Sequence, residues 1–379
     1  HSVLADIPGC KQPALFQEGG NTWLQGEAEA RKTSNYSGLG WLSAGSMMAP
    51  FMPIECYSGW LQDDSFGGPS AEGVNMFSNS VQICTWRNML GGVQYSEAFP
   101  HFMGEMVSSG SVAWIWRYCT NRVLEGLGTV GLGDGQTRRL IMEYRARAAL
   151  CDYGKWSGAY KTLLDNNWGA VWGAEWSPYW INCAPWTARC YVATTNNGGT
   201  LTPERRTLPG WSGANQIPLA VGGATGTVAS VNFTPLGDNL TCQLVYRASD
   251  NSIVYGQPVS SGTCSIKFDK APKNNVVIAV ICNTDWAYLG EYSRTNKSDY
   301  RLTLGTNVTG TANIATKWYS TATTTKGPPV WDGGATGAGT DLDTAANWNT
   351  DTVPSVSSGE TAQFSGLVPG NLSLAHGGT

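Results

Sequence analysis

The pattern of apolar positions divides the chain into a helical stretch and a strand-rich stretch. Apolar residues recur at helical spacing over residues 13–31, 95–107 and 135–153, as expected for helices that bury one face. Further along the chain the pattern changes to short alternating segments separated by Asn, Asp, Gly and Pro, which is typical of antiparallel strands. We therefore predict a mostly helical portion over 1–195 and an antiparallel β-sandwich over 207–305.

Seven segments of the second stretch are candidate strands, and two segments of different composition follow them. The candidate strands read ANQIPLAV, TVASVNFTP, LTCQLVYRA, SIVYGQPV, TCSIKFDKA, NVVIAVICN and YRLTL. A Thr-rich linker is expected over 306–330, and a segment rich in Gly, Thr, Asp and Asn occupies 331–379. The sequence therefore predicts a multidomain α+β protein.

Length and charge exclude some classes of partner. The chain has 379 residues, of which 14% are charged, with a formal net charge of -4. A weakly acidic surface does not neutralise phosphate, so we expect no nucleic-acid partner. No stretch approaches the roughly 20 apolar residues of a membrane-spanning helix, so none is expected.

Cysteine usage indicates an exported protein. The ten cysteines are scattered and form no C-x-x-C pair, which favours a disulfide-rich chain with up to five disulfides over a zinc knuckle. Cys242, Cys264 and Cys282 lie on three successive apolar segments, where a cross-strand pair plus one outside partner is expected. Extracellular or cell-surface localisation agrees with five glycosylation sequons, which begin at Asn35, Asn239, Asn296, Asn307 and Asn371.

The last segment carries a first resemblance. Its W-D-G-G at Trp331, N-W-N around Trp348 and E-T-A-Q-F ending at Phe364 resemble the opening of autotransporter-associated β-strand repeats of large bacterial surface and secreted proteins. The resemblance implies the start of a β-repeat or solenoid stalk, with self-assembly through it, and a chain that is a piece of something longer. Calcium is a candidate ligand of the aspartates in this segment, although such residues also cap turns.

A second resemblance concerns the first 305 residues. The segment Leu15–Leu24 (LFQEGGNTWL) is similar to the glutamate-bearing helix of gluzincin metallopeptidases, and Pro209–Leu219 (PGWSGANQIPL) is similar to the phrase that opens the β-sandwich in a zincin-like family of secreted proteins. The resemblance implies a zincin-like helical portion, truncated at its start, ahead of the sandwich.

Zinc chemistry in that family needs two histidines one helical turn apart and a carboxylate from a second helix. This chain has no His-Glu-x-x-His, but His1 could be the second histidine of a truncated motif and Glu18 the third zinc ligand. Alternatively, His1 is merely where the chain begins and Glu18 is a first-turn helix carboxylate. Whether the chain is an enzyme is therefore left open.

A leading histidine also suggests copper. His1 could bind copper through its amino group and ring, with His101 completing a histidine brace as in lytic polysaccharide monooxygenases. The alternative for His101 is a core histidine between aromatic neighbours.

Tryptophans supply a candidate surface for a macromolecule. Trp60, Trp172, Trp176, Trp180 and Trp186 belong to the Trp-rich loops, and the carboxylates Glu55, Asp63 and Asp64 could take part in glycoside hydrolysis if two of them lay about 5–9.5 Å apart. Seventeen tryptophans spread over one chain are also compatible with core and loop anchors.

The leading hypothesis is a fragment of a large extracellular or cell-surface bacterial protein with a metallopeptidase-like domain, which is either active or inactive and used for macromolecule binding or assembly. Its expected partner is an extracellular protein or glycan. The main alternative is a non-enzymatic structural or glycan-binding surface component. A glycan-active hydrolase and a copper monooxygenase that uses His1 are further alternatives.

Overall fold

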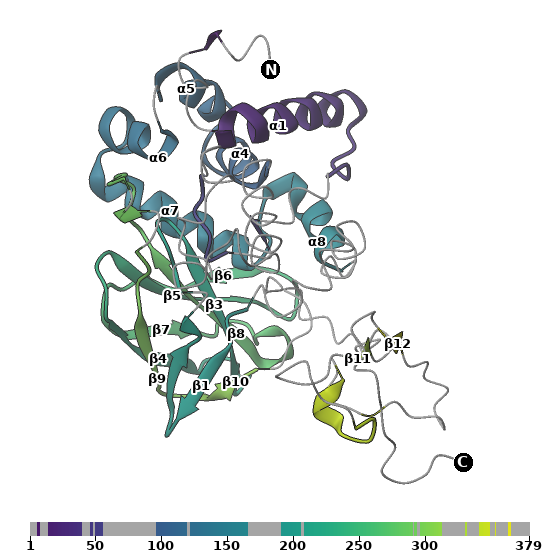
Figure 1. Ribbon diagram of the computed structural model, residues 1–379, viewed down its shortest axis with the longest axis vertical. Coiled ribbons are helices and arrows are strands. Elements are labelled where there is room, and N and C mark those ends of the chain that lie inside the picture. The colour runs from purple at the N-terminus through teal and green to yellow at the C-terminus, as the bar shows by residue number, and fades with distance from the viewer. Residues whose placement is uncertain are drawn as a thin grey trace.

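The structure is a computed structural model, and its elements are labelled in Figure 1. It describes residues 6–7, 14–39, 46–47, 50–55, 96–119, 122–165, 191–205, 208–290, 292–293, 296–312, 330–331, 341–348, 353 and 363–364. The helices are α1 (Ala14–Thr33), α4 (Ala98–Phe102), η6 (Met103–Val107), α5 (Ser111–Tyr118), α6 (Val123–Gly126), η7 (Leu127–Gly131), α7 (Asp134–Ala149), η8 (Gly154–Trp156) and α8 (Ser157–Asp165), followed by the short η11 (Lys273–Asn275) and η13 (Ala345–Asn347).

Ten strands form two antiparallel sheets of five strands each. They are β1 (Thr194–Asn197), β2 (Thr200–Pro203), β3 (Ala214–Val221), β4 (Val228–Pro235), β5 (Leu240–Arg247), β6 (Ile253–Tyr255), β7 (Gly262–Lys267), β8 (Val276–Asn283), β9 (Tyr300–Leu304) and β10 (Val308–Thr311). Sheet 1 has the order β1-β2-β9-β4-β7, and sheet 2 has the order β10-β3-β8-β5-β6. Each of the seven segments predicted as strands contains one, from β3 to β9.

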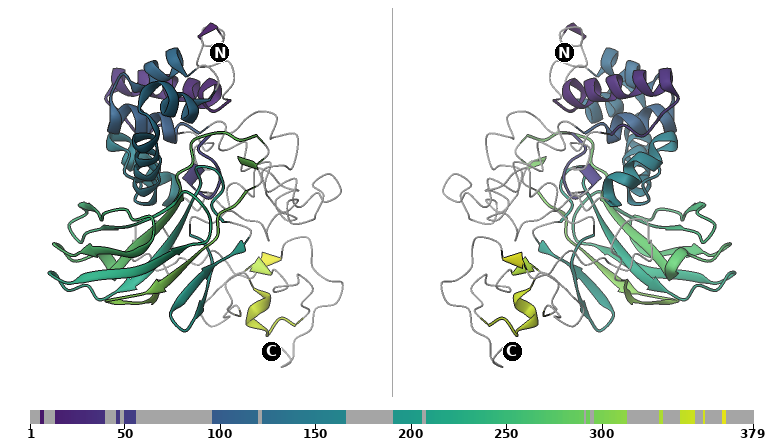
Figure 2. Two further views of the ribbon diagram at one scale, coloured as in Figure 1. Left: turned by 90° about the vertical axis from the view of Figure 1, so that its left-hand side faces the viewer. Right: turned by 90° about the vertical axis from the view of Figure 1, so that its right-hand side faces the viewer.

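The sheets and helices stack as three layers, with sheet 2 in the middle (Figure 2). Strand β8 shows this most clearly because all eight of its residues are buried. Val277, Ala279 and Ile281 join the core between the two sheets, whereas Ile278 and Val280 join the core beneath the helices. A strand that is buried on both faces needs a continuous apolar sequence, which NVVIAVICN provides.

Sheet 1 is covered on one face only. In β7 the inward-facing Cys264 and Ile266 are buried, and the residues between them are exposed. The same alternation in β4 buries Ala229, Val231 and Phe233 on the inner side. Alternation of this kind is typical of a sheet with one solvated face.

Buried arginines connect the helical layer to the sheet beneath it. Arg145 of α7 is fully buried and donates hydrogen bonds to the carbonyl oxygens of Ser212 (2.9 Å) and Met52 (2.6 Å). Arg247 of β5 donates to the carbonyl oxygen of Leu150, just after α7, at 2.6 Å. These bonds satisfy charged groups that would otherwise be costly to bury.

The predicted fold class is wrong for residues 1–195, which were expected to form a mostly helical zincin-like portion. The part of residues 1–195 that the structure describes holds few helices, which cover one sheet of the sandwich and share its core, and a mostly helical zincin-like portion is not shown. The helical spacing over 135–153, which includes Leu140, Ile141 and Tyr144 of α7, was assigned to a helical portion separate from the sandwich. Instead α7 packs on β8, because the outer face of sheet 2 is apolar and has to be covered.

Three strands were missed by the sequence prediction. β1 and β2 form a hairpin in which Asn197 pairs with Thr200, and the two turn residues, Gly198 and Gly199, have φ angles of 57° and 90°. Such angles suit the two-residue turns of hairpins, so the Asn-Gly-Gly sequence was a usable signal. The third missed strand, β10, extends sheet 2 beside β3 after a register shift between Val308 and Gly310.

The C-terminal segment is described only in short pieces. Strand β11 (Val330–Trp331) pairs in parallel with β12 (Gln363–Phe364). The linker interpretation of 306–330 falls mostly outside the described residues, and the domain boundaries stay a prediction. None of the described helices is both long and apolar enough to cross a bilayer.

Candidate functional site

Five buried side chains with hydrogen-bonding groups gather in the middle of the helical layer. Glu27 of α1, Glu97 and His101 around α4, and Trp156 and Tyr160 from η8 and α8 are all buried. Glu97 precedes α4 by one residue, and the His101 N–H donates to the Glu97 carbonyl oxygen at 2.8 Å. This one-turn spacing places both side chains on the same face of the helix. We refer to these five residues as the buried polar cluster.

Hydrogen bonds and ring contacts join the members of this cluster. The Nε1 of Trp156 donates to Glu27 Oε2 at 3.0 Å, and Arg31 donates to Glu27 Oε1 at 2.7 Å. The His101 ring lies 4.2 Å from the Trp156 ring, centroid to centroid. Its Nδ1 lies 2.9 Å from the Tyr160 hydroxyl. Trp156 of η8 thereby contacts both α1 and α4, and His101 connects α4 to α8.

The His101 side chain is neutral in the folded protein. Burial lowers the pKa of His101 well below its usual range, because a charged imidazolium is costly to bury. Within the described structure no hydrogen-bond partner lies against its Nε2. A neutral imidazole of this kind can act as a base or ligand in principle, but this one is sealed from solvent, as the core-histidine alternative predicts.

A further buried carboxylate belongs to Glu55. Its two oxygens accept hydrogen bonds from the backbone N–H groups of Val123 (2.9 Å) and Leu124 (3.1 Å) at the start of α6. Burial raises the pKa of Glu55 to about 7, despite these two hydrogen bonds. Burial, together with the nearby Glu55, also raises the pKa of the Cys119 thiol to about 12. The Cys119 thiol therefore stays protonated at neutral pH.

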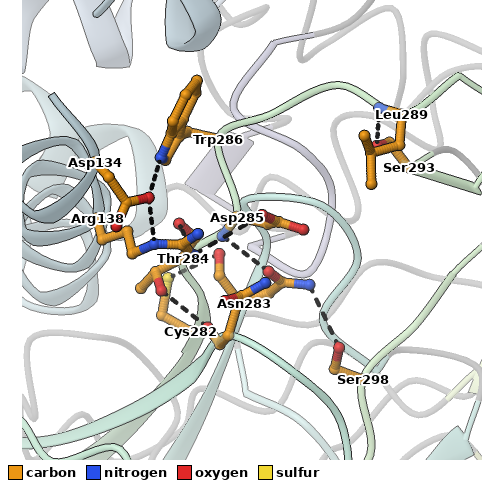
Figure 3. Close-up of polar contacts among 11 residues, drawn as sticks. Asp134, Arg138, Cys282, Asn283, Thr284, Asp285, Trp286, Leu289, Ser293 and Ser298 are labelled. Atoms are coloured by element: carbon orange, nitrogen blue, oxygen red, sulfur yellow. Dashed lines mark hydrogen bonds and ion pairs between the residues drawn. The ribbon is translucent and has the colours of Figure 1, made fainter. Parts of the chain in front are cut away.

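A polar network joins the start of α7 to the loop after β8 (Figure 3). Asp134 Oδ1 accepts hydrogen bonds from Trp286 Nε1 at 2.8 Å and from Arg138 Nε at 2.9 Å. Arg138 also donates to the carbonyl oxygen of Thr284 at 3.3 Å. The Trp286 ring lies over Gly128, where any side chain would collide with it. The network fixes η7 and the loop relative to one another.

An aromatic and aliphatic surface lies on the other side of η7. The rings of Trp114 and Tyr118 on α5 are 5.3 Å apart and tilted by 38°, and Gly131 of η7 packs against Trp114. Tyr118 is 43% exposed and Val130 61% exposed. We call Trp114, Arg117, Tyr118, Val130 and Leu132 the α5–η7 face.

Exposed apolar patches mark interaction sites on folded proteins, and Tyr118, Val130 and Leu132 are each more than 40% exposed. Arg117 holds its guanidinium carbon 5.5 Å from the centre of the Tyr118 ring. Arginine in that position supplies planar hydrogen-bond donors next to the ring. The face therefore combines apolar area with a polar donor at its edge.

Most residues predicted as ligands or aromatic contacts lie outside the described part of the chain. This holds for His1 and for Trp60, Trp172, Trp176, Trp180 and Trp186, together with Asp63 and Asp64. Glu18 lies in α1, but its side chain is not described. Zinc and copper binding therefore stay predictions. Among the described residues, no group of three or more His, Cys, Asp or Glu could hold a metal ion.

The sequons lie in different surroundings. Asn35 and Asn239 are exposed, Asn296 and Asn307 are partly buried, and Asn371 lies outside the described residues. The side-chain amide of Asn307 is engaged by Gly222, donating to its carbonyl oxygen at 2.9 Å and accepting from its N–H at 3.0 Å. Glycosylation itself stays a prediction.

In the C-terminal segment, Asp341 closes a turn. Its two carboxylate oxygens accept hydrogen bonds from the backbone N–H of Asp343 and the hydroxyl of Thr344, both at 3.0 Å. Asp341 thus caps a turn, which is the role that the sequence analysis gave as the alternative to calcium binding.

Sequence reasoning missed several of the residues that form these sites. Glu27 and Glu97 carried no motif, and Tyr118, Val130 and Leu132 are ordinary residues of a helical pattern. Trp114 was one of eight tryptophans considered as platforms for sugar rings, and nothing in the sequence distinguished it from the others. No family model, curated protein or solved structure matches this chain, so the geometry alone supports a function.

Proposed function

We propose that this chain is a non-catalytic, glycan-binding module of an extracellular or cell-surface protein, and that the α5–η7 face is its contact surface. The observation that carries the proposal is the exposed Tyr118 ring, tilted against Trp114, which also packs against Gly131 between the exposed Val130 and Leu132. Aromatic rings bury large area with little loss of conformational freedom, and their faces stack well on the C–H faces of sugar rings.

The charge of the α5–η7 face favours a neutral polysaccharide. Arg117 is its one charged member, and its donors suit sugar hydroxyl groups. Recognition of an acidic polysaccharide would call for several cations, as phosphate recognition does. The low charge of the whole chain, 14% of residues, agrees with a neutral ligand.

The surroundings of His101 support a non-catalytic role. Catalytic acids and bases need access to substrate, and the buried polar cluster is closed to solvent in the described structure. Its hydrogen bonds join α1 to η8 and α4 to α8. The cluster thus supports the helical layer that carries the α5–η7 face.

Retention on insoluble cellulose, chitin and xylan tests the proposal. We expect the chain to be retained on one of them, and Tyr118→Ala to bind about 3- to 10-fold more weakly, the range expected for loss of one stacking ring. Val228→Ala is the control, because Val228 is similarly exposed (40%) and lies on β4 of sheet 1, which sheet 2 separates from the helical layer (Figure 2). Circular dichroism verifies that both variants are folded.

Two results would overturn the proposal. One is a chain that none of the three polysaccharides retains. The other is equal retention of Tyr118→Ala and the wild type. Sedimentation velocity adds a discriminating measurement, since self-association that disappears in Tyr118→Ala would assign the face to a protein contact instead.

A further inference from the structure

Two cysteines meet inside the β-sandwich, one from each sheet. Cys242 lies on β5 of sheet 2 and Cys264 on β7 of sheet 1, 22 residues later in the chain. Both side chains are fully buried in the core between the sheets. The Sγ of Cys264 lies 3.6 Å from the carbonyl oxygen of Cys242. The two residues are therefore adjacent across the sandwich.

The segment between the strands holds them at this distance. Cys242 and Val259 exchange two backbone hydrogen bonds of 2.8 and 2.9 Å. A side chain at Gly256 would lie only 3.0 Å from the carbonyl oxygen of Leu244 and 3.1 Å from that of Ser265. The chain thus crosses from sheet 2 to sheet 1 with the main chains of β5 and β7 close together.

The third cysteine of the sandwich faces the opposite way. Cys282 on β8 pairs with Thr241, the neighbour of Cys242, in the β5–β8 ladder. Successive side chains of a strand point to opposite faces, so Cys282 lies in the core beneath the helices, with Cys242 on the far side of the sheet. Cys282 cannot reach either cysteine of the pair without breaking the sheet.

We propose that Cys242 and Cys264 form an intersheet disulfide when the protein folds in an oxidising compartment. The structure shows both as free thiols, which is the reduced form of the pair. A hydrogen bond between the thiols raises the pKa of Cys242 and lowers that of Cys264.

The reaction consumes a disulfide-class oxidant. One of the two cysteines, ionised as its thiolate, attacks one sulfur of the oxidant and releases a thiol, and the sulfur of the other cysteine then displaces the second thiol to form the Cys242–Cys264 bond. The protein loses two protons and two electrons, and the oxidant becomes two thiols. Since both side chains are buried in the folded chain, the reaction takes place before the sandwich closes.

Peptide mapping tests this proposal independently of glycan binding. The chain is refolded with oxidised and reduced glutathione, unfolded without reductant, alkylated and digested. We expect a linked peptide pair containing Cys242 and Cys264, about 2 Da lighter than the sum of the free peptides, and an alkylated Cys282. Alkylation of both Cys242 and Cys264, or linkage of either to another cysteine, overturns the proposal.

Variants provide a second measurement. In Cys242→Ala we expect Cys264 to be alkylated, and in Cys282→Ala the linked pair to persist. Closing a loop of this length constrains the unfolded chain, so the oxidised wild type should melt roughly 5–10 °C higher than Cys242→Ala/Cys264→Ala. Equal melting temperatures together with an unlinked pair would contradict the inference, and neither result bears on polysaccharide retention.

Discussion

Glu55 Oε2 lies 2.9 Å from the backbone nitrogen of Val123, so a buried carboxylate closes the first turn of α6. The carboxylate connects two segments that are 68 residues apart in the chain. Its charge is costly in that position because water is excluded. The consequence is a dependence of stability on pH that a surface carboxylate would not produce.

Glu55 should destabilise the fold as the pH rises. Its pKa increases from 4.5 in the unfolded chain to about 7 in the folded one, so between these values the folded state binds more protons. The free energy of unfolding therefore falls as pH rises from about 4.5 to 7, and levels off above. From pH 5 to pH 8 this amounts to about 2–3 kcal/mol.

Urea unfolding at pH 5 and pH 8 measures this effect. Glu55→Gln should reduce the difference in unfolding free energy between the two pH values by that amount. Glu143→Gln, at an exposed carboxylate of α7, should leave the difference as in the wild type. An unchanged pH dependence in Glu55→Gln would show that its carboxylate is ionised throughout.

Glu27 should be needed for the packing of Trp156. Glu27→Ala leaves the buried Nε1 of Trp156 without its acceptor, and we expect a loss of about 1–3 kcal/mol in unfolding free energy. Glu27→Gln keeps a carbonyl oxygen in place and should lose less. Chemical denaturation followed by tryptophan fluorescence distinguishes the two, and equal losses would argue against a role for the hydrogen bond.

Gly213 should tolerate no side chain. A Cβ there would lie 2.1 Å from the carbonyl oxygen of Phe51, and because main chain must then move, Gly213→Ala should cost more than about 2 kcal/mol. Gly135→Ala in α7 is the matched control, since nothing lies within 4 Å of its added Cβ. That control should be neutral or stabilising by up to about 1 kcal/mol. Thermal unfolding of both variants gives the comparison.

Asn307 should stabilise the junction of β10 with β3. Asn307→Ala removes both hydrogen bonds to Gly222 and places alanine at a φ of 57°, which favours glycine or asparagine. We expect a loss of about 1–3 kcal/mol. Asn307→Gly loses the same bonds without the backbone strain, so it should be the milder variant in the same unfolding experiment. The reverse order would show that backbone conformation is not the cause.

Helices and strands were predictable where the residues of one short segment are enough to show helical or alternating spacing of apolar positions. The helical spacing over 13–31 and 135–153 corresponds to α1 and α7, and the alternating segments correspond to β3–β9. The buried polar cluster was not predictable, because Glu27, His101 and Trp156 come from three separate helices. Their contacts depend on how these helices pack, and no local pattern records it.

The sequence alone determined the helices α1 and α7 and the strands β3–β9, because apolar periodicity is a local property of the chain. Only the tertiary structure decided that the helices cover sheet 2 instead of forming a zincin-like portion of their own. The apolar face of α7 could pack against other helices or against a sheet. Strand β8 is apolar in all but its last residue and has to be covered on both faces, and α7 covers one of them. The choice of Cys264 over Cys282 as the partner of Cys242 has the same origin, since strand register sets the face to which each thiol points.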